Sequence, residues 1–152
     1  MKGAATLFSS ASVEWATPQP FFAALNREFR FTLDACATAD NAKCRRFFTK
    51  ADDGLVQTWR GRVWLNPPYG RDIGRWMRKA YESSQAGALV VCLVHARTDT
   101  RWFHQYVYGK AEIRFLQGRL VFERPETHAV KRNLHRDSAP FPSMVAIYRP
   151  PE

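Results

Sequence analysis

The hydrophobic and polar positions of the chain predict strands that alternate with helices. Residues 88–94 form a continuous apolar run, which is typical of a central strand buried on both faces. A shorter apolar run, residues 63–65, ends at Asn66 and two prolines, and proline cannot continue a sheet ladder. From Ile73 to Tyr81 apolar residues recur at i, i+3, i+4, i+7 and i+8. This spacing predicts an amphipathic helix that Asp72 can cap.

The segments on either side extend this alternation. Thr17 before Pro18 is typical of a helix N-cap followed by proline at the first helical position, and the apolar residues after it share one helical face. A first strand is expected within residues 29–34, ending at Asp34. The further elements expected are a short strand at 46–49, a turn and short helix through 59, a helix at 98–107, and strands at 113–116, 118–123 and 143–148.

These elements indicate one α/β domain with a β-rich C-terminal end. We expect a flexible arm over residues 1–14 and a single domain over residues 15–150, because 152 residues can bury about two-thirds of the unfolded surface. No run approaches the roughly 18 apolar residues of a membrane span, and no signal peptide is evident. Three cysteines without a CxxC pair favour a reduced, cytoplasmic interior.

The charge of the chain favours a polyanionic partner. Lysine and arginine number 23 against 14 acidic residues, a net charge of +9, and DNA or RNA is the commonest partner of such a surface. A first basic group follows the predicted strand end and lies on the polar side of the helix expected around residues 73–81, where a solvated helix face explains it equally well: Arg71, Arg75, Arg78 and Lys79. Lys131, Arg132 and Arg136 lie in a polar loop, residues 124–138, and are the better candidates for phosphate contact.

Candidate chemistry gathers at Asn66, Pro67, Pro68 and Tyr69, at the end of a predicted strand. In open α/β sheets ligands bind at the carboxyl ends of strands. Asn-Pro-Pro-Tyr in this setting resembles the motif of S-adenosylmethionine (SAM)-dependent methyltransferases that modify exocyclic or amide nitrogens. The same motif occurs in enzymes that methylate release-factor glutamine or RNA guanine.

These residue types suit methylation of an exocyclic amine. Such a nitrogen is a poor nucleophile because its lone pair is delocalised into the ring. The Asn66 side-chain oxygen and the Pro67 carbonyl can accept both of its N–H groups, and proline adds no competing donor. No strong base is needed because the methyl donor is a sulfonium, so positioning and charge complementarity supply the rate. Tyr69 would stack on a base flipped out of the duplex.

Candidate residues for the cofactor precede this motif. The resemblance implies that Thr17 and Pro18 lie at the cofactor, and a helix N-terminus suits the carboxylate of SAM. Asp34 and the small residues after it form the turn that approaches the cofactor in such enzymes, although residues 36 and 37 stand where glycines are common. Either Asp52 or Asp53 can bind the ribose or adenine. The candidate set is Trp15, Thr17, Pro18, Asp34, Ala35, Cys36, Ala37, Asp52, Asp53 and Asn66.

Taken together, the motifs resemble phage N-6-adenine DNA methyltransferases, a small Dam-type family. The matching pattern includes Trp-Ala-Thr-Pro at 15–18, Thr-Leu-Asp-Ala-Cys-Ala at 32–37, Asn-Pro-Pro-Tyr-Gly at 66–70 and Ala-Pro-Phe-Pro-Ser at 139–143. The resemblance covers roughly residues 13 to 148 and implies a Rossmann-like methyltransferase sheet, SAM as cofactor, and methyl transfer to adenine N6 in double-stranded DNA. It also implies a phage or prophage gene acting in a bacterial cytoplasm, with protection from host restriction as one role.

Two features are unusual for such a sheet. Only about 28 residues separate Asp34 from the strand before Asn66, so we expect one βα unit there to be shortened or missing. The chain also leaves no room for a separate target-recognition domain.

Three alternatives stay open. Cytosine-N4 methyltransferases use the same motif in the same way. Methylation of protein glutamine or of RNA is a more distant enzymatic alternative. A DNA-binding module with a decayed SAM site is the non-enzymatic alternative. Histidines and cysteines lack metal-ligand spacing, so no metal site is expected. The sequence indicates neither a membrane nor a particular protein partner.

Overall fold

The computed structural model describes residues 16–122 and 139–152. Four groups of predictions lie outside these residues: the arm at 1–14, the cofactor candidate Trp15, the loop at 124–138, and its basic residues Lys131, Arg132 and Arg136.

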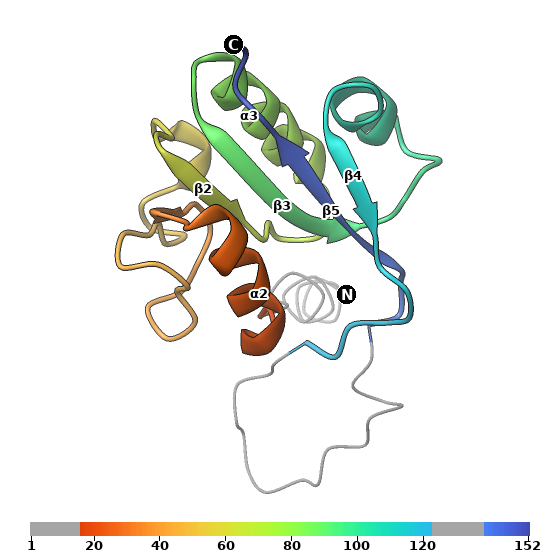
Figure 1. Ribbon diagram of the computed structural model, residues 1–152, viewed down its shortest axis with the longest axis horizontal. Coiled ribbons are helices and arrows are strands. Elements are labelled where there is room, and N and C mark those ends of the chain that lie inside the picture. Colours follow the sequence, from red (N-terminus) through yellow and green to blue (C-terminus); the bar gives the residue numbers. More distant parts are fainter. Residues whose placement is uncertain (1–15, 123–138) are drawn as a thin grey trace, which may run out of the picture.

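A five-stranded mixed sheet in the order β1-β2-β3-β5-β4 forms the centre of the fold (Figure 1). Its strands are β1 (Leu33–Asp34), β2 (Arg62–Leu65), β3 (Leu89–His95), β4 (Glu112–Phe115) and β5 (Ser143–Tyr148). β1, β2 and β3 are parallel, whereas β5 runs antiparallel to both β3 and β4. The carboxyl ends of the three parallel strands therefore meet at one edge of the sheet. The predicted mixed α/β fold is confirmed.

The centre of the sheet is apolar on both faces. Every residue from Val90 to Val94 on β3 is buried, and all six residues of β5 are buried beside it. Continuous apolar runs rather than alternating ones are what a two-sided core requires. The run at 88–94 therefore predicted β3 to within one residue.

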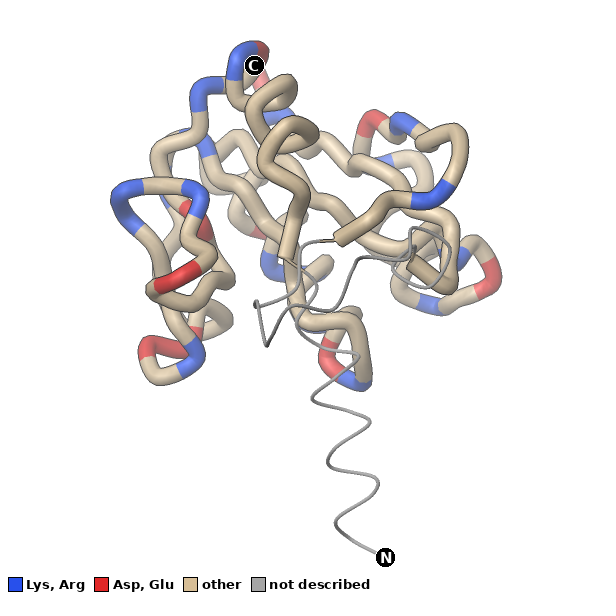
Figure 2. Tube along the Cα trace, turned by 90° about the horizontal axis from the view of Figure 1, so that it is seen from below, with Lys and Arg blue, Asp and Glu red and all other residues tan. Residues whose placement is uncertain are grey.

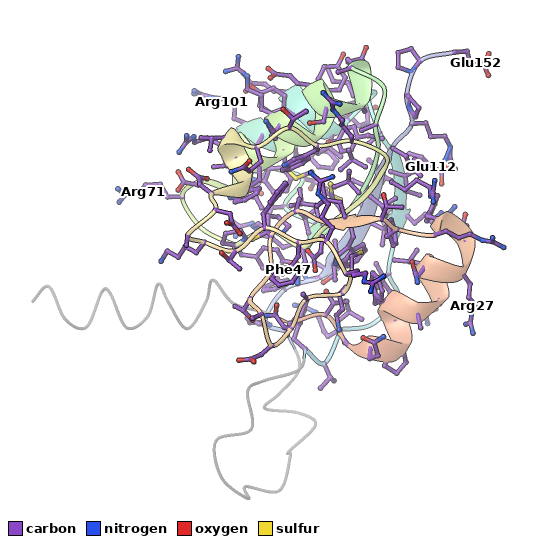
Figure 3. The ribbon with its side chains drawn as sticks, turned by 90° about the vertical axis from the view of Figure 1, so that its left-hand side faces the viewer. Arg27, Phe47, Arg71, Arg101, Glu112 and Glu152 are labelled. Atoms are coloured by element: carbon purple, nitrogen blue, oxygen red, sulfur yellow. The ribbon has the colours of Figure 1, made fainter. Side chains whose placement is uncertain are left out.

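Two helices lie on opposite sides of the sheet (Figure 3). α3 (Ile73–Gln85) buries its predicted stripe, with Trp76, Met77 and Ala80 fully or almost fully covered. α2 (Gln19–Phe29) covers the other face, where the Phe22 ring meets Trp64 of β2 edge-on at 5.3 Å between ring centroids. Two short helical turns complete the fold: η1 (Gly54–Val56), a 3-10 turn, and η2 (Phe103–Val107), a π-helical turn. No helix among the described residues is both long and apolar enough to span a bilayer.

Ion pairs tie α2 to the β4 edge of the sheet. Arg114 of β4 donates to both carboxylate oxygens of Glu28, each at 2.7 Å, and also to Glu112 at 2.9 Å. Arg149 donates to the other Glu112 oxygen at 3.2 Å. The hydrogen bond from Arg114 lowers the pKa of Glu28. These side chains are exposed, so the network is expected to contribute little to the stability of the fold.

Several predicted elements are shorter than the sequence suggested. The first strand was expected within 29–34, but α2 continues through Phe29, and Arg30 ends it in the left-handed conformation with φ 53°. The strand expected at 46–49 is one parallel bridge between Phe47 and Asp34. The helix expected to reach residue 59 is the three-residue turn η1. Residues 118–122 form no strand of the sheet. Local patterning alone therefore overestimates the length of these segments.

Candidate functional site

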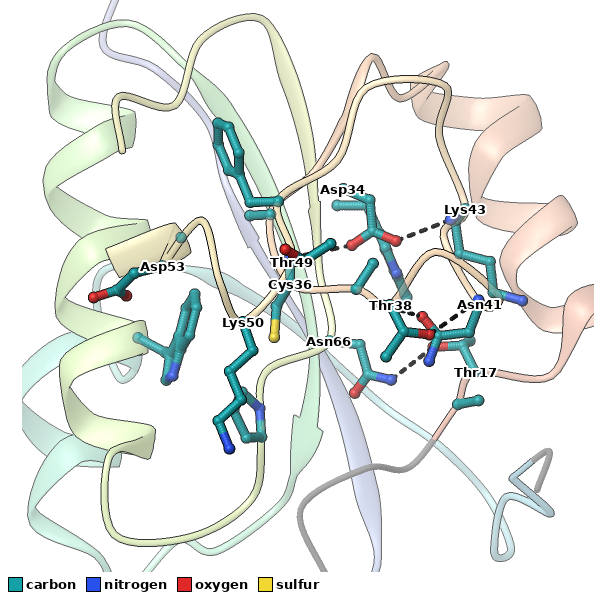
Figure 4. Close-up of a pocket in the computed structure, with 18 residues that line it drawn as sticks. Thr17, Asp34, Cys36, Thr38, Asn41, Lys43, Thr49, Lys50, Asp53 and Asn66 are labelled. Atoms are coloured by element: carbon teal, nitrogen blue, oxygen red, sulfur yellow. Dashed lines mark hydrogen bonds between the residues drawn. The ribbon is translucent and has the colours of Figure 1, made fainter. Parts of the chain in front are cut away.

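One cavity opens where the loops after β1 and β2 come together (Figure 4). Its walls come from residues within the segments 16–17, 34–43, 48–54 and 64–68 and from Trp76 of α3. The predicted candidates that line it are Thr17, Asp34, Ala35, Cys36, Ala37, Asp53, Asn66 and Pro68. The structure therefore brings together in one place residues that are up to 51 positions apart in the chain.

Four predicted residues lie outside this lining: Pro18, Asp52, Pro67 and Tyr69. Asp52 is held in its own turn, where its Oδ2 accepts the Thr49 backbone N–H at 2.8 Å and the Thr49 hydroxyl at 3.0 Å. These bonds lower the pKa of Asp52. Of the two aspartates that the sequence could not separate, only Asp53 is among the residues that line the cavity.

The wall also contains residues that sequence reasoning did not select. They include Thr38, Asn41, Lys43, Phe48, Lys50 and Trp76. Thr38 and Asn41 exchange hydrogen bonds between side chain and backbone in both directions, at 2.7 and 3.2 Å. The spacing Thr-x-x-Asn is the available signal for such a closed turn. Nothing comparable in the sequence marks Lys50 or Phe48.

Asp34 holds the loop that follows β1. Its side chain is only 2% exposed; Oδ1 accepts the Cys36 N–H at 3.3 Å and Oδ2 accepts the Lys43 N–H at 2.9 Å. The backbone of Asp34 bonds residues 46 and 48 as well. Burial outweighs these bonds and raises the pKa of Asp34 to about 6. The acid at the end of β1 thus closes the loop of residues 35–43 around the cavity.

Asn66 follows the last residue of β2 and is oriented from the other side of the cavity. Its Nδ2 donates to the Thr17 hydroxyl at 3.0 Å (Figure 4). Thr17 is 1% exposed, so this contact is shielded from water. The predicted N-cap role of Thr17 is wrong: α2 starts at Gln19 after Pro18, with no side-chain cap. The Thr17 hydroxyl serves the Asn66 amide instead of the helix.

Tyr69 turns away from the cavity into an aromatic cluster. Its hydroxyl donates to the Leu93 carbonyl at 3.0 Å, and the residue is 6% exposed. His95, Phe122 and Phe141 surround the ring, with centroids 5.0, 6.4 and 5.2 Å away. Burial raises the pKa of Tyr69 and lowers that of His95 to about 4. Both side chains are therefore neutral at pH 7.

A glycine allows the two loops that form the cavity to approach. A Cβ on Gly54 would overlap the carbonyl oxygen of Ala35. The Gly54 carbonyl accepts the Trp59 indole N–H at 2.8 Å, and the Trp59 and Trp76 rings stack at 6.1 Å. Trp64 and Trp76 are buried, as expected, and both also contribute to the cavity wall.

Positive charge is spread over several loops and helix ends of the described chain (Figure 2). Arg71 and Arg75 are exposed at the start of α3, and Arg75 pairs with Asp72 at 3.7 Å. Asp72 is the residue before α3, but its side chain makes no capping hydrogen bond. The predicted basic residues Arg71 and Arg75 are therefore on the surface, and they follow the Asn66 loop closely in the chain.

The amino-acid sequence of the chain is similar to those of known proteins. The family model described as DNA N-6-adenine-methyltransferase (Dam) matches residues 5–152. A DNA N-6-adenine-methyltransferase of Haemophilus phage HP1 is 31% identical over 140 residues, which is 90% of this chain and 78% of that protein. A protein of the same name from Escherichia phage T1 is 33% identical over 111 residues, 70% of this chain and 46% of that protein. The chain belongs to the DNA N-6-adenine-methyltransferase (Dam) family.

Proposed function

We propose that this protein transfers a methyl group from SAM to the N6 atom of adenine in double-stranded DNA. Family membership supports the reaction class and the substrate. The observation that carries the proposal for this site is the placement of Asn66. It stands at the carboxyl end of β2 and faces the same cavity as the loop closed by Asp34.

The proposal includes a shortened Rossmann-like sheet in a single domain, residues 15–150. The parallel arrangement of β1, β2 and β3, with the cavity at their carboxyl ends, supports it. Between β1 and β2 the chain forms only the turn η1, which is consistent with a reduced βα unit. The proposed setting is the cytoplasm of a bacterial host.

The cavity has the groups that SAM needs. Asp34 and Asp53 offer carboxylates for an ammonium or ribose hydroxyls, and Lys43 and Lys50 offer positive charge for a carboxylate. Ala35, Cys36 and Ala37 expose backbone close to the cavity, as small residues allow. The rings of Phe48 and Trp76 offer apolar surface for the adenine of the cofactor. The residues present therefore fit the cofactor.

Bound SAM would supply an electrophilic methyl group on a sulfonium. The chain's contribution is to orient the target amine: the Asn66 side-chain oxygen and the Pro67 carbonyl accept its two N–H groups and direct its lone pair toward the methyl. Because Thr17 accepts from Nδ2, the amide is held with Oδ1 as the atom for the amine. Pro68 lines the cavity beside it and stiffens the loop.

The proposed stacking of the target base on Tyr69 carries a structural requirement. Phe122, Phe141 and His95 surround the Tyr69 ring. A base that reaches the ring must displace at least one of these side chains. Phe141 is partly exposed and would move most readily, since residues 139–142 form no helix or strand.

Asn66→Ala tests the proposal. We expect SAM affinity, measured by calorimetry, to stay within a few-fold of the wild type, because the lost atoms serve the amine. Methyl transfer from labelled SAM to unmethylated duplex DNA should fall by about a hundredfold or more, as for the loss of a group that acts in the transition state. Transfer at a near wild-type rate would remove Asn66 from the reaction.

Thr17 offers a matched pair for the orientation of the amide. Thr17→Val removes the acceptor without changing the shape, and we expect kcat to fall by about tenfold or more. Thr17→Ser keeps a hydroxyl and should restore most of the rate. Equal loss in both variants would mean that Thr17 acts through packing and not through its hydroxyl.

A further inference from the structure

A second surface feature lies between α3 and the start of η2, outside the proposed methyl-transfer cavity. It is a groove lined by Arg71, Arg75 and Arg78 from the α3 side and by Arg101 and Gln105 from the η2 side. The two sides are 23 residues or more apart in the chain. Arg71 and Arg101 project on the same side of the molecule, and Arg27 of α2 lies at the opposite end (Figure 3).

The floor of the groove depends on a close approach of two segments. Gly74 of α3 faces Trp102, and a Cβ added at Gly74 would sit 3.5 Å from the Trp102 Cβ. Trp102 is 8% exposed and anchors the η2 segment in the core. The groove is therefore a fixed feature of the packing between α3 and η2.

The charge of the groove is positive. Four arginines line it, and the carboxylates beside it are Asp72, 3.7 Å from Arg75, and Glu82, 2.7 Å from Arg78. Within residues 16–122 and 139–152, neither Arg71 nor Arg101 has a carboxylate at ion-pair distance. Two guanidinium groups are thus uncompensated on a surface that is shaped and held in place.

The spacing of the arginines matches a polyanion that runs along α3. Arg75 and Arg78 are three residues apart on α3, which is about 4.5 Å of helix rise, and Arg71 lies in the turn just before the helix. Phosphates of one DNA strand advance about 3.4 Å each along the helix axis. Guanidinium groups bind phosphate oxygens in a bidentate way and carry no base information.

We propose that this α3–η2 groove binds the sugar–phosphate backbone of the DNA substrate beside the target adenine. The groove begins at Arg71, five residues after Asn66 in the chain. A strand held there would bring its neighbouring nucleotide toward the Asn66 loop. The inference rests on the proposed function, and it adds a sequence-independent contact that includes Arg78 and Arg101.

The test compares Arg101→Gln and the double variant Arg78→Gln/Arg101→Gln with Arg27→Gln, an exposed arginine on α2. Binding of a fluorescent unmethylated duplex is followed by anisotropy as salt is varied, with S-adenosylhomocysteine present to prevent turnover. Each lost phosphate contact should make the plot of log affinity against log salt less steep by about 0.9. Affinity at 0.1 M salt should fall by roughly tenfold per contact. Arg27→Gln should match the wild type.

A second arm identifies the backbone as the ligand. Uncharged methylphosphonate linkages placed one at a time beside the target adenine should weaken wild-type binding at one or two positions. At those positions Arg101→Gln should cause no further loss. Circular dichroism and SAM binding of each variant report whether the fold is kept.

An unchanged affinity and salt dependence in the folded double variant would overturn the assignment. Failure of the proposed function looks different, because the wild type itself would then neither bind nor methylate the duplex.

Discussion

Asp34 has a structural task that the sequence does not reveal. Its place at a strand end suggested a ligand for the cofactor, yet both of its oxygens already accept backbone N–H groups of the next loop. Its burial is a tertiary effect of the Phe47 bridge and the cavity wall, so composition and spacing carry no sign of it. Its roles in holding the loop and in facing a ligand are compatible, since it also lines the cavity.

The pKa of Asp34 makes stability depend on pH. The folded chain keeps the proton up to about pH 6, whereas the unfolded chain releases it near 3.8. Between these values the folded state binds more protons, so its free energy of unfolding falls as pH rises. The gap corresponds to at most roughly 3 kcal/mol. Asp34→Asn should flatten this part of the profile.

Urea unfolding at pH 4 and pH 7 measures this effect. From pH 4 to pH 7 the wild type should lose stability and Asp34→Asn should not, so the difference in free energy of unfolding should shift in favour of the variant. This holds even if the variant is less stable at both pH values because it loses one acceptor. An identical pH profile in the two proteins would show that the buried carboxyl does not titrate in this range.

Among the elements, η1 is the one that determines the shape of the cavity. It places Gly54 against Ala35 and lets Trp59 and Trp76 stack behind the wall. The sequence predicted a turn and a short helix through Trp59 here. In the structure the helical turn ends at its C-cap residue Gln57, and the Trp59 indole N–H donates back to the Gly54 carbonyl.

Gly54→Ala should destabilise the fold by about 1–3 kcal/mol, because the new methyl group meets a backbone carbonyl that cannot rotate away. SAM binding should weaken along with it. Gly74→Ala is the matched control: its Cβ would be at an ordinary contact distance of 3.5 Å within α3, and helix propensity favours alanine over glycine. Chemical denaturation of both variants checks the difference. A Gly54→Ala protein as stable as Gly74→Ala would contradict the close approach.

Elements with a strong periodic pattern were predictable, and elements shaped by their neighbours were not. α3 and β3 follow from a five-position stripe and a seven-residue apolar run. β1 has only two residues: α2 takes Phe29 from the expected strand, and Arg30 follows in the left-handed conformation. The sequence also predicted that Asn66 lies at the cavity, since the prolines fix the end of β2. The Thr17–Asn66 contact spans 49 residues and has no local signal.

For the whole molecule, the arrangement gives each surface a separate task. The cavity at the carboxyl ends of β1 and β2 is proposed to hold the cofactor and the amine, and the α3–η2 groove is proposed to hold the DNA backbone. Net charge predicted a polyanion as partner. It did not predict that Arg101 joins Arg71, because only the packing of η2 on α3 brings them to one groove.

The central claim is tested most directly by methyl transfer itself. Wild-type protein is incubated with labelled SAM and unmethylated duplex DNA, and the product is digested to nucleosides. We expect the label in N6-methyl-2′-deoxyadenosine. Label in N4-methyl-2′-deoxycytidine would contradict adenine as the target base but would leave the proposed site unchanged. No transfer and no SAM binding by the folded protein would contradict the account as a whole.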